Sequence, residues 1–128
     1  MRTKWYKNAV VYQIFPDRFF ASETPKKNVP EDRFLVENRE QTPEYRQNNG
    51  PCSLGNDYYG GDLEGIIQKL PYLSSLGVSI IYLNPSFEAH SNHRYDTANY
   101  RRIDPLLGTQ QDFEELTKKA GDGSSLLF

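Results

Sequence analysis

Two short apolar runs interrupt an otherwise polar chain. Residues 9–15 (AVVYQIF) and residues 78–83 (VSIIYL) are rich in β-branched and aromatic side chains, and a proline follows each run within two positions. Nearly continuous apolar strands are typical of parallel sheets that are covered on both faces. We therefore predict two strands here, each buried on both faces.

Two further segments carry apolar residues at helical spacing. The first begins after Asp62, whose carboxylate can accept hydrogen bonds from the first backbone N–H groups of a helix. It should be kinked at Pro71 and end at Gly77, which readily adopts the left-handed conformation of a C-terminal cap. The second helix begins after Thr109. Their apolar faces comprise Leu63, Ile66, Ile67, Leu70, Leu73 and Leu76 in the first helix, and Phe113, Leu116 and Ala120 in the second.

Long polar segments follow both predicted strands. Residues 21–56 are rich in Pro, Asn, Glu, Lys and Arg, with one short helix expected at residues 31–38, and residues 84–108 form a second long loop. The order strand–helix–strand–helix indicates an α/β fold built on a right-handed βαβ unit. In (β/α)8 barrels, the loops that follow the strands build the active site. We therefore predict an incomplete (β/α)8 TIM barrel that comprises the first two βα units, with long loops at the active end.

A small nucleotide-binding protein is the other α/β architecture that the order of elements allows. Such a sheet places a Gly-rich turn after its first strand, whereas residues 16–19 read PDRF. The pair Gly60-Gly61 lacks the lysine that a P-loop carries. Both observations favour the barrel, and stabilisation by a nucleotide would favour the alternative.

The composition excludes several classes of protein. The 128 residues carry a formal net charge of −2, without the concentrated basic patch of a nucleic-acid-binding protein. Cys52 is the single cysteine of the sequence, which excludes an intrachain disulfide. Neither a signal peptide nor an apolar window as long as a membrane span is visible. We therefore expect a cytoplasmic chain with no membrane or nucleic-acid partner.

Two stretches of the sequence carry a family resemblance. Residues 10–19 read VVYQIFPDRF, and residues 58–116 include YYGGD, LPYLSSLGVSIIYLNP and SNHRYDTANYRRIDP. In this order and spacing they resemble the start of the catalytic barrel of the α-amylase family, glycoside hydrolase family 13, in the manner of neopullulanases, cyclomaltodextrinases and maltogenic amylases. The resemblance implies a fragment of a glycoside hydrolase that acts on α-glucans such as starch, maltodextrin, cyclodextrin or pullulan. Residues 1–120 would be the N-terminal part of the barrel, and residues 121–128 a tail that departs from the family pattern.

The resemblance assigns substrate binding to one loop. Tyr95, in the motif HRYD, matches the family tyrosine that stacks beneath the sugar at the cleavage point, where a rigid ring offers the apolar sugar face a platform. His93 could donate a hydrogen bond to a sugar hydroxyl in its neutral form, or merely tie the loop to a neighbouring carbonyl. We expect Asp96 to hydrogen-bond loop backbone and His90 to be solvated.

Three polar residues at the predicted strand ends have local explanations. Asp17 and Arg18 form an adjacent acid and base, and a local ion pair or an arginine-anchored turn is a better interpretation of them than catalysis. Asn84 follows the second strand. It either faces the active end, by the logic of the barrel, or caps the strand.

Calcium is the one cofactor that the resemblance raises. Several family members bind this ion with oxygens from the first long loop and from the GGD turn, where Gly60 and Asp62 match. An ungapped register from the motif DRF fills the first-loop ligand positions with Ala21, Glu23, Lys26 and Lys27. A protonated lysine cannot ligate calcium, so we expect no metal, and Asp62 is then a helix cap. A gapped alignment that recruits Asn28 or Asp32 would keep a calcium site open.

The resemblance places no catalytic residue in this chain. Retaining glycosidases use two carboxyl groups in a double displacement, one as the nucleophile and one as the acid and base. In the α-amylase family these acids belong to later barrel strands, so we expect them beyond the end of this chain and expect the chain alone to be inactive. A frameshift, a premature stop or a misjudged gene boundary just after Ala120 is one economical explanation. The alternative function is a non-catalytic glucan-binding module that uses Tyr95 without turnover.

Overall fold

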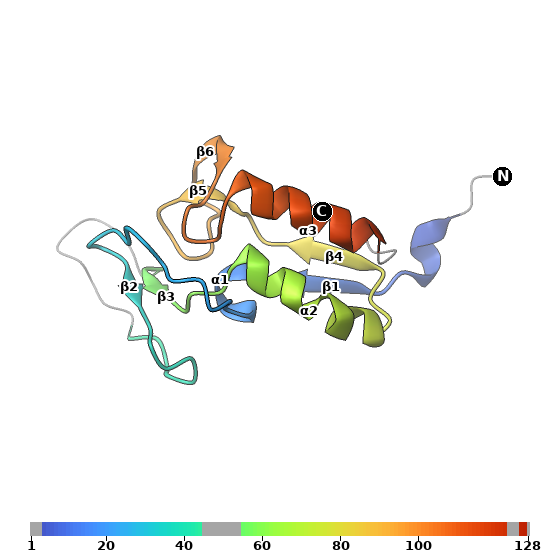
Figure 1. The fold of residues 1–128 in the computed structure, drawn as a ribbon, viewed down its shortest axis with the longest axis horizontal. Helices are drawn as coiled ribbons and strands as arrows, with labels where there is room; N and C mark the ends of the chain where they lie inside the picture. The colour runs from blue at the N-terminus through green and yellow to red at the C-terminus, as the bar shows by residue number, and fades with distance from the viewer. Residues whose placement is uncertain (1–3, 45–54, 123–125, 128) are drawn as a thin grey trace.

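A parallel sheet lies at the centre of the structure, a computed structural model that describes residues 4–44, 55–122 and 126–127. The sheet has the strand order β1–β4–β7, and two long helices lie between successive strands in the sequence. This order of elements confirms the predicted α/β class (Figure 1). The central elements are β1 (Val11–Ile14), α2 (Leu63–Ser75), β4 (Ile80–Leu83), α3 (Gln110–Asp122) and β7 (Leu126–Leu127).

Shorter elements gather around the carboxyl ends of β1 and β4 (Figure 1). One of them, α1 (Pro16–Phe19), follows β1 directly, while a 3-10 turn, η1 (Trp5–Asn8), precedes β1 at the opposite end of the sheet. The others are a parallel pair, β2 (Phe34–Leu35) with β3 (Asp57–Tyr58), and an antiparallel hairpin, β5 (Phe87–Ala89) with β6 (Thr97–Ile103). These elements lie within the segments that follow the central strands. In barrels, such segments form the functional site at the carboxyl end of the strands.

Both predicted helices are confirmed, together with their caps. The Asp62 carboxylate accepts a hydrogen bond from the Gly65 backbone N–H at 2.7 Å, and Gly77 ends α2 with a φ of 77°. At the start of α3, the Thr109 hydroxyl accepts from the Asp112 N–H at 3.1 Å, and the Asp112 carboxylate accepts from the Thr109 N–H at 2.8 Å. These paired bonds satisfy backbone groups that a helix cannot satisfy internally.

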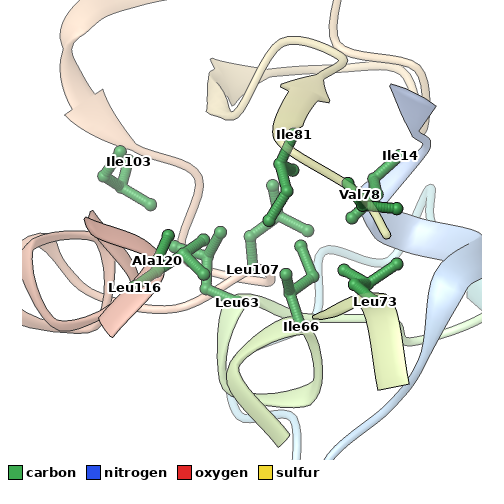
Figure 2. Close-up of a cluster of buried hydrophobic side chains, with 10 residues drawn as sticks. All are labelled: Ile14, Leu63, Ile66, Leu73, Val78, Ile81, Ile103, Leu107, Leu116 and Ala120. Carbon is green, nitrogen blue, oxygen red and sulfur yellow. The ribbon is translucent and has the colours of Figure 1, made fainter. Parts of the chain in front are cut away.

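One apolar core joins the sheet to the two helices (Figure 2). The strands contribute Ile14 and Ile81, each at most 1% exposed. Each large aliphatic side chain buried in this way contributes roughly 1.5–3 kcal/mol, so the core is the main source of stability. Its other members are Leu63, Ile66, Leu73, Val78, Ile103, Leu107, Leu116 and Ala120.

The prediction that both strands are buried on both faces is only partly right. Both α2 and α3 pack on the sheet face that carries Ile14 and Ile81. On the opposite face, Val11 is 57% exposed and Tyr82 is 43% exposed, whereas Ile80, the register partner of Val11, is 8% exposed. Because both long helices pack on the first face, the cover of this second face is only partial.

Two predictions about the long segments are also corrected. Residues 31–38 contain no helix, because the Phe34 and Val36 N–H groups donate to the carbonyls of Asn56 and Tyr58 at 2.9 and 2.7 Å and so build the β2–β3 pair. Residues 84–108 are not a plain loop, since β5 and β6 pair within them. In the described part of the chain, no helix is long and apolar enough to cross a membrane.

Residues 121–122 and 126–127 continue the fold further than the sequence predicts. Helix α3 extends to Asp122, past the division that we placed after residue 120. Residues 126 and 127 then pair in parallel with Ile80 and Ile81 of β4, as a short third strand. The chain therefore has a β–α–β–α–β order, whereas the sequence predicts an order that ends after the second helix.

Gly65 is expected to tolerate no side chain. A Cβ atom at this position would lie 2.0 Å from the Phe20 carbonyl oxygen. Helix propensity alone predicts that Gly65→Ala raises the free energy of unfolding by up to about 1 kcal/mol. The overlap with the Phe20 backbone should outweigh this gain, so that the variant lowers the free energy of unfolding by about 1–3 kcal/mol. Urea denaturation measures the difference.

Gly121→Ala is the matched control for this substitution. A Cβ atom added at this exposed position in α3 meets no described atom within 4 Å. The variant should therefore keep the gain of up to about 1 kcal/mol that helix propensity predicts. Equal stability of Gly65→Ala and the wild type would contradict the close packing of Phe20 on α2.

Candidate functional site

The candidate site is the loop of residues 90–96, which connects β5 to β6 at the carboxyl end of β1 and β4 (Figure 1). Its sequence is HSNHRYD, and it contains Tyr95, to which the resemblance assigns sugar binding, and His93, the second candidate. Tyr95 is 58% exposed, and His93 is half-buried beside it. The two rings lie 5.9 Å apart between centroids, at an interplanar angle of 37°.

Asp96 organises the backbone of the 90–96 loop, as predicted for it. Its carboxylate accepts hydrogen bonds from the Ser91 N–H at 3.2 Å and from the Ser91 hydroxyl. The Ser91 hydroxyl oxygen in turn accepts from the Arg94 N–H at 3.2 Å. The short side chains of Ser and Asp are well suited to such local bonds with backbone groups, so the loop closes on itself.

The hydrogen bonds of His93 identify its protonated nitrogen. Nδ1 lies 3.1 Å from the backbone N–H of Tyr95, and a backbone N–H can only donate. The Ser91 hydroxyl oxygen lies at the same distance, 3.1 Å, from Nδ1. When Nδ1 accepts from the Tyr95 N–H, it carries the lone pair, and a neutral His93 then carries its proton on Nε2. Within the described ranges, no protein group accepts a hydrogen bond from Nε2. The ring thus keeps one donor for a ligand while its other nitrogen fixes the Tyr95 backbone.

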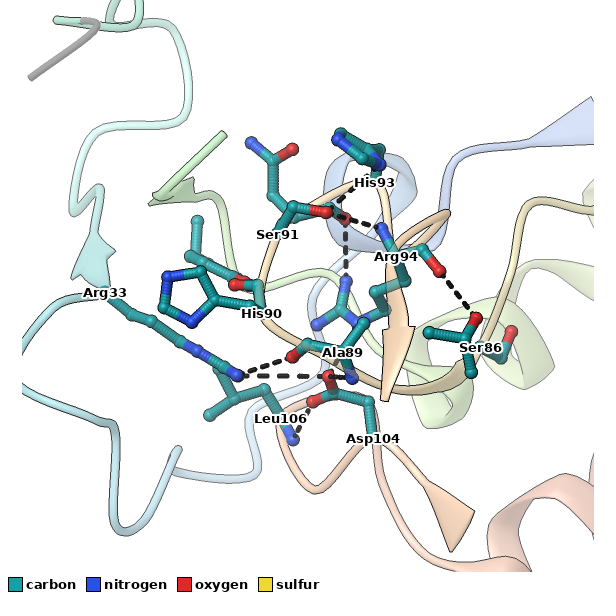
Figure 3. A network of polar contacts seen from close by, with 12 residues as sticks. Arg33, Ser86, Ala89, His90, Ser91, His93, Arg94, Asp104 and Leu106 are labelled. Atoms are coloured by element: carbon teal, nitrogen blue, oxygen red, sulfur yellow. Dashed lines mark hydrogen bonds and ion pairs between the residues drawn. The ribbon is translucent and has the colours of Figure 1, made fainter. Parts of the chain in front are cut away.

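A buried ion pair holds the loop from below (Figure 3). Arg94 is 1% exposed, and Asp104 is fully buried. The Arg94 Nε lies 3.1 Å from Oδ2 of Asp104. Its Nη1 donates to the Asn92 carbonyl at 2.9 Å, and its guanidinium lies over the Tyr58 ring at 5.4 Å. Arg33 adds a second cation to the same carboxylate at 3.8 Å. The side chain between His93 and Tyr95 is therefore an internal anchor.

The anchor keeps Arg94 in an uncommon backbone conformation. Its φ is 59°, in the left-handed region that few residues other than glycine adopt. This conformation turns the chain so that the Arg94 side chain enters the interior while Tyr95 remains exposed. Strain of about 1–3 kcal/mol is tolerated where surrounding contacts over-determine the geometry, and the Asp104 pair supplies such contacts.

Residues 55–58 fasten the loop from the side. The Asn92 N–H donates to the Gly55 carbonyl at 2.7 Å, and the Asn92 side-chain amide donates to the Asp57 carbonyl at 2.8 Å. The Tyr58 hydroxyl donates to the His90 carbonyl at 2.5 Å. Burial raises the pKa of the Tyr58 hydroxyl, so it remains a proton donor at neutral pH. The 90–96 loop is thus attached by three hydrogen bonds to residues 55–58, the segment that contains β3.

The remaining predicted polar residues have structural partners. The expected solvation of His90 is only partly right, because its half-exposed ring lies 3.2 Å from the Asp32 carboxylate. Asn84 is buried, and its side-chain oxygen accepts from the Gln13 amide at 2.7 Å while its N–H donates to the Ile14 carbonyl at 2.9 Å. These bonds tie the end of β4 to β1.

Of the two local interpretations of Asp17 and Arg18, the ion pair is not formed between these described side chains, and the Arg18 N–H donates to the Phe15 carbonyl at 3.0 Å in the turn after β1. Asp17 is 1% exposed and accepts from the Tyr59 N–H at 3.1 Å. The exposed Arg18 instead lies over the rings of Phe15 and Tyr59, at 5.1 and 5.3 Å. Because Asp17 is enclosed, the interpretation of this pair as structural rather than catalytic still holds.

Asp62, the calcium candidate, already has its acceptor positions filled. The carboxylate accepts from the Lys26 ammonium at 2.5 Å, from the Ser22 hydroxyl at 2.6 Å and N–H at 3.1 Å, and from the Gly65 N–H. Across residues 4–44, 55–122 and 126–127, no three His, Cys, Asp or Glu side chains gather as metal ligands. A cationic donor at the carboxylate does not fit calcium, which requires several oxygens at once.

Sequence reasoning missed the anchor of the candidate site. Arg94, Tyr58 and Asp104 lie within the quoted family motifs and Arg33 lies outside them, but no motif marks any of the four as an anchor. Arginine and aspartate are almost never fully buried unless paired. Their separation in the sequence hides the pairing. The one available signal is the position of Arg94 between two residues with assigned roles.

Asp96→Asn should change how stability depends on pH. Burial raises the pKa of Asp96, but hydrogen bonds from Ser91 outweigh it and hold the pKa below the ordinary value of 3.8. A carboxyl group with a depressed pKa stabilises the fold at pH values above its ordinary pKa. This stability is lost as the pH falls through the folded-state pKa. Asp96→Asn should thus be less stable at pH 7, with a deficit that shrinks below pH 3.8, as thermal unfolding at several pH values measures.

Asp17→Asn should show the opposite trend and serves as the control. Burial raises the pKa of Asp17, outweighing the bonds from Tyr59 and the charge of Arg94. The folded state therefore binds this proton more tightly, and the wild type should lose stability relative to Asp17→Asn as the pH rises above 3.8. Identical trends for both variants would contradict these assignments.

Comparisons with known proteins agree with the resemblance in the sequence. The family model "Alpha amylase, catalytic domain" matches residues 13–124. An amylopullulanase from Thermoanaerobacterium saccharolyticum is 47% identical over 131 residues, which cover 91% of this chain and 10% of the relative. A cyclomaltodextrinase from Thermoanaerobacter pseudethanolicus is 40% identical over 126 residues, which cover 98% of this chain and 19% of the relative.

A solved structure shows the same fold. The cyclic α-maltosyl-(1→6)-maltose hydrolase from Arthrobacter globiformis, in complex with cyclic α-maltosyl-(1→6)-maltose, superposes with a TM-score of 0.71 at 33% identity. The match covers 97% of this chain and 25% of that enzyme. The chain therefore spans a quarter or less of the proteins that it matches. Since the family model matches residues 13–124, well over half of the sequence, the chain belongs to the α-amylase family.

Proposed function

We propose that this chain is the N-terminal part of the catalytic barrel of a glycoside hydrolase that acts on α-glucans. It supplies part of the sugar-binding surface, through Tyr95 and His93, and no catalytic carboxylate. The observation that carries the proposal is the exposed Tyr95 ring beside a histidine that keeps one donor, on a loop anchored by a buried ion pair.

The chemistry of an α-glucan fits this surface. A glucose ring has an apolar face, which an exposed aromatic ring can cover without a large loss of conformational entropy. Its hydroxyls can accept a hydrogen bond from an imidazole N–H such as the one on His93. Relatives are named amylopullulanase and cyclomaltodextrinase, and one solved structure holds a cyclic maltosyl-maltose. These names support α-glucans as the substrate class.

The carboxylates near the loop support the absence of catalytic acids from this chain. Asp17 accepts from backbone, Asp62 from Lys26, Asp96 from Ser91, and Asp104 pairs with Arg94. A retaining mechanism needs two carboxyl groups about 5–5.5 Å apart that face the glycosidic bond, one as nucleophile and one as acid and base. We place both in the part of the barrel that follows this chain.

Grafting tests the proposed function. Residues 13–122 would replace the matching segment of the cyclomaltodextrinase from Thermoanaerobacter pseudethanolicus, and reducing-sugar release from cyclodextrin would be measured. The chimera should hydrolyse cyclodextrin, whereas the chain alone should release no sugar above the blank. Hydrolysis by the chain alone would contradict the placement of the acids. A folded chimera without activity, together with a chain that binds glucan, would favour the non-catalytic glucan-binding alternative.

A further inference from the structure

The Asp62 carboxylate joins the first long loop to the start of α2. It is 3% exposed, and a buried carboxylate requires donors or a counter-ion that compensate for its lost hydration. The donors come from both sides, with Ser22 and Lys26 from the loop and Gly65 from the helix. Asp62 is therefore more than a helix cap, because it also holds residues 22–26 in place.

Lys26 supplies the positive charge at this junction. Its ammonium lies 2.5 Å from Asp62 Oδ2, and its side chain is 14% exposed. Its Cε lies 3.9 Å from the position that a Cβ of Gly60 would occupy. The lysine therefore pairs with Asp62 and passes beside Gly60, the two residues of the GGD turn that match calcium ligands in the family resemblance.

Further bonds show how closely the loop lies on the helix. The Asp62 N–H donates to the Phe20 carbonyl at 3.1 Å, and the Gly61 N–H donates to the Asp17 carbonyl at 2.7 Å. The Thr24 hydroxyl donates to the Glu64 carboxylate at 2.6 Å. The charged contact from Lys26 thus completes a continuous attachment between residues 17–26 and the start of α2.

We propose that the Lys26 ammonium is a built-in cation that replaces calcium at the GGD turn and fastens the first loop to α2 without a metal. One tethered ammonium provides the charge that the buried carboxylate needs, and it physically occupies the position beside Gly60 and Asp62. The attachment of this loop should therefore be insensitive to chelators and to added calcium.

The test compares thermal unfolding of the full chain in millimolar CaCl2 and in EDTA. The wild type should have the same Tm in both solutions. Lys26→Met should lower the Tm by roughly 4 °C or more, while Lys27→Met should leave it unchanged, because the neighbouring Lys27 is exposed and undergoes the same chemical change. A higher Tm of the wild type in calcium, or equal Tm values for the two methionine variants, would overturn the proposal.

A third variant tests whether the ammonium stands at a cation position. Lys26→Asp removes the ammonium and adds carboxylate oxygens beside Asp62, Ser22 and Thr24, which are ligand types that calcium accepts. Its Tm should rise by several degrees from EDTA to CaCl2, and tyrosine-sensitised terbium luminescence should appear in this variant and not in the wild type. A Lys26→Asp variant without any response to calcium or terbium would overturn the assignment, whether or not Lys26→Met folds.

Discussion

Asp104→Asn is expected to lower the free energy of unfolding by about 3–5 kcal/mol, since removing one member of a buried ion pair leaves its partner charged and uncompensated. Asp104 is fully buried and faces the guanidinium groups of Arg94 and Arg33 at 3.1 and 3.8 Å. Among the described residues, neither Nε nor Nη2 of Arg94 finds a hydrogen-bond acceptor, so the contact with Asp104 is one of charge. Urea denaturation of the variant and the wild type measures the loss.

Two further variants separate the effect of burying the ion pair from the effect of removing a charge. Glu115→Gln breaks an exposed pair with Lys119, at 2.8 Å and about half exposed on both sides, and should change stability by about 0.5 kcal/mol or less. The double variant Arg94→Met with Asp104→Leu removes both buried charges and should lose less than Asp104→Asn alone. If Asp104→Asn were as stable as Glu115→Gln, the buried pair would not anchor the 90–96 loop.

Tyr95→Ala is expected to weaken glucan binding by about tenfold or more, because the ring supplies the platform for the apolar sugar face. A single platform gives weak affinity, so the wild-type chain should bind maltoheptaose with a Kd on the order of 1–10 mM. Tyr95→Phe should retain binding, since the ring and not the hydroxyl makes the contact. NMR titration of each variant measures the affinities.

Tyr100→Ala provides the matched control for this loss. Tyr100 is 72% exposed on the same hairpin, and its ring lies 5.8 Å from Phe87 rather than beside His93. The variant removes an exposed tyrosine without altering the 90–96 loop, and it should bind maltoheptaose like the wild type. Equal losses for Tyr95→Ala and Tyr100→Ala would indicate nonspecific contact between sugar and exposed aromatic rings.

The long elements could be predicted from the sequence because each carries a local signal. Asp62 and Thr109 cap helices whose apolar residues repeat at helical spacing, and Gly77 supplies the left-handed end. The hairpin of β5 and β6 has no such signal, since TANYRRI shows no alternation of apolar residues and lies mostly exposed. Its pairing also contains register irregularities, which a pattern in one strand does not encode.

Burial and partner choice are the features that the sequence left open. The exposed Val11 could not be foreseen, because its burial depends on whether another element covers that face of the sheet. Two-residue strands such as β2 depend on a partner twenty or more positions away and carry no pattern of their own. In the site, Tyr95 came from the family resemblance and His93 from its hydrogen-bonding chemistry beside Tyr95, while the buried role of Arg94 required the fold.

We propose that this chain carries a sugar platform of an α-amylase-family barrel without the carboxylates that cleave the sugar. One NMR titration of the chain with maltoheptaose tests both parts of this proposal. We expect shifts of the Tyr95 and His93 resonances while the anomeric signals of the sugar remain those of intact maltoheptaose. Unchanged Tyr95 and His93 resonances, or new reducing-end signals from cleaved sugar, would contradict it.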